Sequence, residues 1–266
     1  MPNIVVQADN LYKAYDSGTV ALDGFSIAAF EGEIMGLIGP NGAGKTTTIK
    51  ILVGLLMPDG GKITILGHNI LVDSITYKEH IGYMPEAPAL PEYLTVTEFL
   101  GYVGRIRDIQ KDELSRRVEE LLRRLDLVLK ANETIATLSK GMRAKLAFAA
   151  ATIHNPKLLI LDEPLLGIDP AGQRLIKDQL AGMARDGVCI LVSTHQLDTA
   201  ERLCSKVSII NHGKNIATGD LSSLRSQAHA GEKQTLEEIF LKLTDEAGMP
   251  EPEMPRRKGL FARRVS

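Results

Sequence analysis

Tryptophan is absent from this sequence of 266 residues, and aromatic residues make up only 5% of it. There are two cysteines, Cys189 and Cys204, and they form no Cys-x-x-Cys pair. This pattern argues against a disulfide-stabilised scaffold and against a cysteine-based zinc site. It is typical of proteins from a reducing compartment.

Long apolar runs are also missing. A membrane-spanning helix needs about 20 apolar residues in succession, whereas the longest apolar run here covers residues 147–153. The N-terminus carries Asp9 and Asp16 instead of the basic and apolar segments of an export signal. We therefore expect an intracellular chain that carries nothing across a membrane by itself.

An excess of positive charge is lacking too. The 31 Lys and Arg residues face 33 Asp and Glu residues, which gives a net charge of −2. This balance argues against a chain whose main task is to bind nucleic acid, so we expect no nucleic-acid partner. The apolar share of 44% is enough for a sizeable core. At about 150 residues per domain, the length predicts one large domain or two small ones.

The order of apolar patterns predicts an α/β fold. Strand-like segments cover residues 4–6, 24–29, 33–38, 62–66, 158–161, 188–193 and 207–210. Helical patterns between them, one of which runs from Ile49 to Leu56, give the rhythm of a parallel sheet covered on both faces. From about Pro85 to Ala151 the pattern becomes helical, with an apolar stripe within residues 113–129 and a helix expected from Ala144 to Ile153.

These changes in pattern divide the chain. We expect residues 1–86 and 151–222 to form an α/β core and residues 87–150 to form an inserted helical subdomain. Residues 223–266 would form a short helix at 235–241 and a flexible tail. The tail ends in a basic tip, Arg256-Arg257-Lys258 and Arg263-Arg264. The tip is either a solvated end or a segment attracted to anionic lipid headgroups.

A glycine-rich turn lies between a predicted strand and a predicted helix, and it fits the pattern G-x-x-x-x-G-K-[ST]. Such a turn directs several backbone N–H groups at phosphate oxygens, and the following helix adds its positive end. Lys45 would lie across the β- and γ-phosphates, and the Thr46 hydroxyl would hold Mg²⁺. The expected nucleotide-binding residues here are Gly39, Pro40, Asn41, Gly42, Ala43, Gly44, Lys45, Thr46 and Thr47.

Two acids end the apolar strand at 158–161. Ligands of an open parallel sheet bind beyond the carboxyl ends of its strands, so Asp162 and Glu163 should face the phosphate loop. Side chains alternate along a strand, which predicts that the two carboxylates point in different directions. Asp162 suits the Mg²⁺ shell, and Glu163 suits the polarisation of a water that attacks the γ-phosphorus.

With these motifs, residues 3–222 resemble the nucleotide-binding subunit of an ATP-binding cassette (ABC) transporter. Residues 138–142, Leu-Ser-Lys-Gly-Met, resemble the family's signature, usually written LSGGQ. Lys140 replaces a glycine and Met142 replaces the glutamine, whereas Ser139 and Gly141, which meet the γ-phosphate in the family, are retained. The implied fold is α/β: a P-loop NTPase (RecA-like) parallel-sheet core with an N-terminal antiparallel β region and an inserted helical subdomain.

The resemblance assigns further roles. Glu86 stands at the Q-loop, where the family has glutamine, and would reach Mg²⁺ or the attacking water. Asp169 corresponds to the D-loop and His195 to the switch histidine. Tyr15 sits where the family stacks an aromatic ring on adenine, with Tyr12 as the competing choice. The implied catalytic residues are thus Glu163, His195 and Lys45, and the implied metal-binding residues are Thr46, Glu86 and Asp162.

The resemblance also implies cofactors and partners. ATP and Mg²⁺ would be held between two head-to-tail cassettes, a homodimer or a paired ABC subunit, with residues 139–142 (Ser139, Lys140, Gly141 and Met142) meeting the partner's nucleotide. The helical insertion would transmit closure to transmembrane permease subunits, which would hold the chain at the cytoplasmic face of the cell membrane. The variant signature, Glu86 and the short tail helix resemble exporters of drugs or polymers.

Other functions fit less well. A non-transport ABC ATPase that acts on ribosomes or nucleic acid stays open, although a single phosphate loop and the net charge of −2 argue against it. A GTPase would need an Asn/Thr-Lys-x-Asp motif, which is absent from the sequence. A small-molecule kinase would leave residues 138–142 unexplained. We therefore expect an ATPase that couples ATP hydrolysis to transport.

Overall fold

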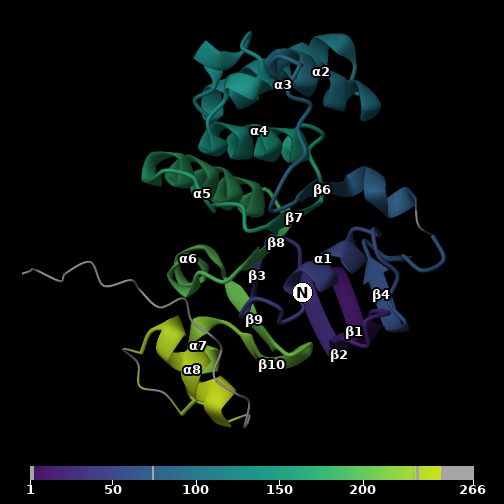
Figure 1. Ribbon diagram of the computed structural model, residues 1–266, viewed down its shortest axis with the longest axis vertical. Helices are drawn as coiled ribbons and strands as arrows, with labels where there is room; N and C mark the ends of the chain where they lie inside the picture. The colour runs from purple at the N-terminus through teal and green to yellow at the C-terminus, as the bar shows by residue number, and fades with distance from the viewer. Residues whose placement is uncertain (1–2, 74, 230, 232–233, 247–266) are drawn as a thin grey trace, which may run out of the picture.

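The computed structural model of the protein describes residues 3–73, 75–229, 231 and 234–246. Across these residues the central sheet has six strands in the order β10-β9-β3-β8-β7-β6 (Figure 1). The strands are β3 (Ile34–Ile38), β6 (Ile81–Met84), β7 (Leu158–Asp162), β8 (Cys189–Thr194), β9 (Lys206–Asn211) and β10 (Lys214–Gly219). All pairs are parallel except β9 with β10. Strands β3, β7 and β8 are buried throughout, which explains their continuous apolar sequences.

A second, antiparallel sheet lies beside the first, as expected for the N-terminal region. Its strands are β2 (Val20–Phe30), β1 (Ile4–Ala14), β4 (Gly60–Ile65) and β5 (His68–Asn69), in that spatial order. Strands β1 and β2 are longer than the predicted segments 4–6 and 24–29. Register shifts at several points along this pair change which face each side chain occupies. The alternation of apolar and polar residues is therefore interrupted at these points, although the strands continue.

The helices that cover the core begin with α1 (Lys45–Leu52), which follows the phosphate loop. The predicted helix through Leu56 is too long: Gly54 adopts φ +69 and Leu55 is 68% exposed, so the helix ends before them. The 3-10 helix η1 (Thr76–His80) precedes β6. Helices α5 (Pro170–Arg185) and α6 (Leu197–Leu203) connect the strands β7, β8 and β9.

Between β6 and β7 the chain is helical and forms one end of the molecule (Figure 1). This region contains α2 (Val96–Ile106), α3 (Lys111–Arg124), η2 (Val128–Lys130), η3 (Ile135–Thr137) and α4 (Lys140–Thr152). Helix α4 starts at Lys140, four residues before the predicted Ala144, because the Ser139 side chain accepts a hydrogen bond from the Met142 N–H and caps it. Helix α3 ends at Arg124 rather than continuing to residue 129, and Asp126 adopts φ +56. The division at residues 87–150 stays a prediction.

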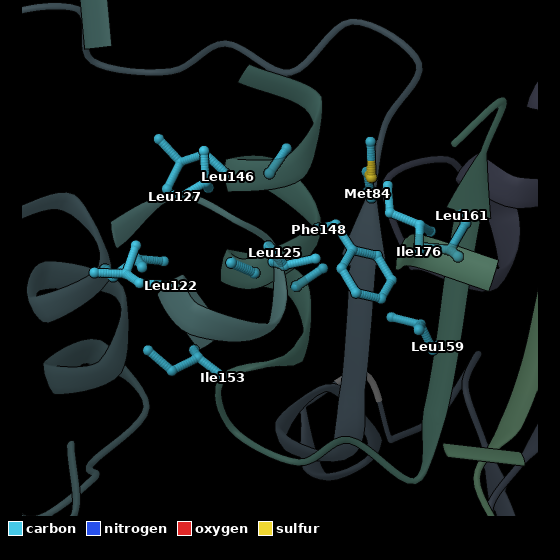
Figure 2. Packing of buried hydrophobic residues seen from close by; sticks show 14 of the residues in the cluster. Met84, Leu122, Leu125, Leu127, Leu146, Phe148, Ile153, Leu159, Leu161 and Ile176 are labelled. Atoms are coloured by element: carbon cyan, nitrogen blue, oxygen red, sulfur yellow. The ribbon is translucent and has the colours of Figure 1, made fainter. Parts of the chain in front are cut away.

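One apolar cluster joins the helical region to the central sheet. Phe148 on α4 is 1% exposed and points toward Leu159, Leu161 and Ile176, while Leu122 and Leu125 pack on the opposite side of α4 (Figure 2). Burial of this cluster makes α4 the element that connects the two regions.

Two helices end the described chain. Helices α7 (Leu221–Gln227) and α8 (Leu236–Glu246) bury Leu224, Ile239 and Phe240 in a cluster with strand β9. Helix α8 corresponds to the helix predicted at 235–241. The basic tip at 256–264 lies outside the described residues. Among the helices of the described residues, none has the length and apolar character to cross a membrane.

The phosphate loop is held in place where it packs tightly against two other segments, which contain Ala21 and Gly213. A Cβ atom on Gly44 would lie 2.6 Å from the Ala21 carbonyl oxygen, and one on Gly213 would lie 2.7 Å from that same oxygen. The Gly213 N–H donates to the Ala43 carbonyl and the Asp23 N–H donates to the Gly213 carbonyl. The loop is thus held between the antiparallel sheet and the turn that joins β9 to β10.

Candidate nucleotide-binding site

The phosphate loop depends on glycines at defined positions. Gly44 precedes α1 with φ +113, a conformation that side-chain-bearing residues rarely adopt. Gly39 directly follows β3 and lies in close contact with β9, where a Cβ atom would lie 2.1 Å from the Ile210 carbonyl oxygen. The backbone therefore follows a path that only glycine allows, and this path places the loop at the start of a helix, where an anion is favoured.

Lys45 extends back over the loop and is only 7% exposed. Its Nζ donates to the carbonyl oxygens of Gly39 at 2.8 Å and Pro40 at 3.0 Å. Burial lowers the pKa of this ammonium, and the negative charges of Glu163, Asp162 and Glu86 oppose that shift. A buried cation with three carboxylates in electrostatic reach is thus the centre of the site.

Asp162 ends β7 and is 3% exposed. Its Oδ1 accepts a hydrogen bond from the Ser193 hydroxyl, and its Oδ2 accepts one from the Thr46 hydroxyl at 3.3 Å. A carboxylate beside a hydroxyl is a donor set of hard oxygens, which Mg²⁺ prefers, and Mg²⁺ takes its other ligands from phosphates and water. These residues fit the ion, although within the described ranges no cluster of three acidic, histidine or cysteine side chains could hold a metal without a nucleotide.

Glu163 has hydrogen-bond partners other than those of Asp162. Its φ of +50 is unusual for a residue with a side chain. One carboxylate oxygen accepts hydrogen bonds from the His195 backbone N–H at 2.8 Å and from His195 Nδ1 at 2.7 Å. The other oxygen accepts from the Thr194 hydroxyl at 3.0 Å. Three donors at the end of β8 therefore fix the direction of this carboxylate.

Two further expected residues lie at the same site. Glu86, just beyond β6, is exposed, and its charge acts on Lys45. The Tyr15 hydroxyl lies 3.1 Å from the Thr47 hydroxyl, and the Tyr15 ring is 39% exposed. Tyr12 is equally exposed at 40%, and its carbonyl accepts from the Asp59 N–H on the β4 side. The choice between the two rings for adenine stays a prediction.

The signature residues and Asp169 form a separate group. A Cβ atom on Gly141 would lie 3.6 Å from the Gly167 carbonyl oxygen and 3.6 Å from Ile168 Cα. Asp169 caps α5 by accepting from the Gly172 N–H at 3.0 Å, and that hydrogen bond is the main cause of its lowered pKa. Across the described ranges, no hydrogen bond or ion pair joins this group to the phosphate loop or to Glu163.

Sequence reasoning missed the residues that hold the acids in place. Ser193 and Thr194 are buried hydroxyl residues at the end of β8, beside β7, and each orients one carboxylate. Lys145 on α4 is 7% exposed and its positive charge adds to the lowering of the Asp169 pKa. The sequence feature that could have predicted their role is the pair of hydroxyl residues that ends an apolar strand directly before His195.

A glycine loop with a buried lysine, together with a carboxylate pair at the end of another parallel strand of the same sheet, defines a P-loop nucleotide-hydrolysing protein. Residues 22–166 match the sequence pattern of the ABC transporter family, and the chain belongs to that family. It is an ATP-binding ABC ATPase of a transporter.

Relatives and solved structures agree with this assignment. The chain is 36% identical over 223 residues to the linearmycin resistance ATP-binding protein LnrL of Bacillus subtilis, covering 84% of this chain and 71% of LnrL. It is 37% identical over 224 residues to the Nod factor export ATP-binding protein I of Paraburkholderia xenovorans, covering 84% and 73% of the two chains. A solved ATP-binding subunit of an ABC transporter superposes with a TM-score of 0.85 at 34% identity, covering 90% of this chain and 99% of that one.

Proposed function

We propose that this protein is the ATP-hydrolysing subunit of an exporter and that it works as a head-to-tail dimer. Its partner would be a second copy or a related ABC subunit, and permease subunits would hold the pair at the cytoplasmic face of the membrane. The relatives named for linearmycin resistance and for Nod factor export support the direction of transport. Their names also favour transport over the alternative of a non-transport ATPase.

The separation of the two groups of site residues carries this proposal. Thr46 donates to Asp162, and Lys45 lies in electrostatic reach of Asp162 and Glu163. The Ser139 side chain accepts only from the Met142 N–H, within its own helix start. The capped start of α4 offers a second positive helix end to an anion. Two chains placed head to tail would bring that helix end to the other chain's nucleotide.

Closure of such a dimer by ATP requires a large difference in binding. A shift from 1:99 to 99:1 needs about 5.5 kcal/mol of preference for the closed state. Lys45 of one chain and Ser139 of the other would contact the same γ-phosphate only when the dimer is closed. That shared contact supplies the preference, and hydrolysis removes it.

The residues around Lys45 support a direct hydrolysis. Glu163 would accept a proton from a water whose oxygen bonds to the γ-phosphorus, while the bond from that phosphorus to the β–γ bridging oxygen breaks, to give ADP and phosphate. His195 would keep the Glu163 carboxylate directed at that water. Thr46, Asp162 and Glu86 would hold Mg²⁺, which neutralises phosphate charge when it is bound.

An exposed apolar surface supports the docking of a membrane partner. The 3-10 helix η1 lies between the segment after α1 and the end of α2: a Cβ atom on Gly54 would lie 2.8 Å from Lys78 Cε, and an Arg107 guanidinium N–H donates to the Lys78 carbonyl at 3.0 Å. The exposed apolar residues in and beside these segments are Leu55, Met57, Leu71, Val72, Ile75, Tyr102 and Ile106. Exposed apolar side chains on neighbouring segments are typical of a protein interface.

The test replaces Glu163 with glutamine. Glu163→Gln keeps the shape of the side chain but cannot take the proton, so we expect ATP binding to be retained and turnover to fall at least about 100-fold. ATP should then trap a dimer that gel filtration detects. Hydrolysis at the normal rate by this variant would contradict the assigned role of Glu163.

Lys45→Ala is the opposite control. It removes the buried ammonium that would meet the phosphates, so we expect it to lose ATP binding itself in a fluorescent-nucleotide titration. In the unaltered protein, specific activity should fall on dilution as the dimer dissociates. Brisk hydrolysis by a strictly monomeric chain would overturn the dimer proposal.

A further inference from the structure

Two charged residues stand where the family's pattern has uncharged ones, and their charges are opposite. Glu86 replaces the Q-loop glutamine, and Lys140 replaces a signature glycine. One belongs to the group of residues around the phosphate loop, and the other belongs to the group around the start of α4. The proposed hydrolysis places Glu86 at Mg²⁺ but does not require a charge there in place of the uncharged glutamine, and it gives Lys140 no role that requires a charge.

Glu86 adds negative charge to a site that already has an excess of it. Its carboxylate lies in electrostatic reach of Lys45, together with Asp162 and Glu163. Glu86 is exposed, so its carboxylate is open to solvent and to a partner chain. In a single chain, three carboxylates therefore face one ammonium before any triphosphate binds.

Lys140 is the first residue of α4 and is exposed beside the D-loop. Its side chain lies over Gly167: a Cβ atom on Gly167 would lie 2.9 Å from Lys140 Cε and 3.2 Å from Lys140 Nζ. The packing on Gly167 directs the ammonium along the surface formed by the signature and the D-loop. Both of these motifs belong to the face that would meet the partner.

Neither side chain has an ion-pair partner among the described residues of its own chain. Over the residues that the structure describes, Lys140 and Glu86 form no ion pair and no hydrogen bond with each other or with any other side chain. By contrast, other charged side chains of the helical region do form ion pairs, such as Arg143 with Glu92 at 2.6 Å. The head-to-tail dimer proposed above would bring these two unpaired charges to one interface.

We propose that Lys140 of one chain and Glu86 of the other face each other across the dimer interface and form a complementary charge pair. This proposal rests on the dimer proposed above. An open chain would carry the additional negative charge of Glu86 beside the nucleotide, and closure would neutralise it with the ammonium of the partner. The pair would therefore favour the closed state, and the unpaired charge of Glu86 would disfavour nucleotide binding to an open chain.

Mixed dimers provide the test, with all chains carrying Glu163→Gln so that ATP holds them together. Glu86→Gln chains alone leave Lys140 unpaired at both interface sites, and Lys140→Ala chains alone leave Glu86 unpaired at both. A mixed dimer contains one site with both charges and one site with neither. We expect the mixed dimer to form roughly threefold to tenfold more tightly than either variant alone, as measured by analytical ultracentrifugation of differently labelled chains.

Two control variants separate charge from local helix effects. Lys140→Arg keeps the charge and should dimerise like the parent. Lys111→Ala removes the same charge from the first residue of another helix, α3, away from the signature, and should leave dimerisation unchanged. The preference for mixed dimers should weaken as salt is raised from about 0.05 to 0.5 M.

The outcomes separate the two proposals. If the Glu163→Gln parent forms no dimer with ATP, the dimer itself is wrong. If the parent dimerises but the two variants mix without preference, the dimer stands and the pairing of Lys140 with Glu86 is overturned. A loss in Lys140→Arg equal to that in Lys140→Ala would also overturn the pairing.

Discussion

Glu163 illustrates how single residues make this site work. A carboxylate that polarises water must keep one direction, and the structure achieves this with three donors from the two residues Thr194 and His195. Glu163 adopts a left-handed backbone, and its carboxylate accepts from other donors than the Asp162 carboxylate does, so two adjacent acids can serve different purposes. The direction of the carboxylate therefore depends on β8 as much as on β7.

Replacement of Thr194 tests this dependence. Thr194→Val keeps the shape of the side chain but removes the donor to one Glu163 oxygen. We expect kcat for ATP hydrolysis to fall about tenfold, because the carboxylate loses one of the hydrogen bonds that orient it. The affinity for ATP should stay unchanged, because within the part of the chain that the structure describes the Thr194 hydroxyl makes no hydrogen bond to the phosphate loop. Steady-state kinetics and nucleotide titration separate the two effects. A change in ATP affinity with unaltered kcat would contradict the argument.

The sequence predicts the motif residues of this site, but not the residues that orient them through hydrogen bonds. Lys45, Thr46 and Asp162 occur in motifs whose spacing follows from phosphate and metal chemistry, and the structure brings them together. Ser193 and Thr194 act through contacts between strands that are distant in sequence, so spacing alone gave no indication of their role. The functional roles of all these residues stay predictions until the variants are measured.

At the level of the elements, short caps decide where helices begin. Thr95 precedes α2: its hydroxyl accepts from the Glu98 N–H at 3.2 Å, and the Glu98 carboxylate accepts from the Thr95 N–H at 2.8 Å. Ser139 caps α4 in the same manner with one such bond. The predicted start of α4 at Ala144 was wrong because the apolar pattern begins later than the cap.

Thr95→Ala tests the cap on α2. The variant loses the hydroxyl acceptor, and the free energy of unfolding should fall by about 1 kcal/mol, as measured by urea denaturation. Thr95→Ser should retain most of the stability. Ser115→Ala is a matched control, because the Ser115 hydroxyl donates to a carbonyl inside α3 and its loss should change stability by less than about 0.5 kcal/mol.

At the scale of the whole molecule, one histidine connects the helical region to the sheet. His154 follows α4, and its Nε2 lies 3.0 Å from the Ile81 carbonyl oxygen, while its buried Nδ1 has no partner among the described residues. Burial, with the nearby positive charge of Arg107, lowers the pKa of His154 from 6.5 to about 4. The neutral ring is therefore the form that the folded protein accommodates.

This shift predicts a loss of stability in acid. Below pH 6.5 the unfolded chain takes up a proton that the folded ring refuses until about pH 4, so the free energy of unfolding should decrease as the pH falls through this window. The loss of unfolding free energy that His154 causes over this window is about 3 kcal/mol. Thermal or urea denaturation of the protein and of His154→Gln across this range would measure it. Equal pH dependence of the two would exclude His154 as the source.

The fold class followed from the order of apolar segments, since buried parallel strands are continuous apolar runs and the inserted region is helical. The lengths of β1 and β2 did not follow, because bulges hide the alternation. The positions where α1 and α3 end could not be predicted from the apolar pattern either. Gly54 and Asp126 leave the helical conformation, although the apolar pattern continues beyond them.

The junction of Ala21, Gly44 and Gly213 has a genetic consequence. Glycine and alanine codons differ by a single base, and alanine is the smallest side chain that such a change can introduce. At Gly44 or Gly213, that single methyl group would collide with one carbonyl oxygen and displace the loop from the strands that hold it. Null alleles of this gene should therefore include glycine-to-alanine changes at Gly213, a position with no role in the chemistry.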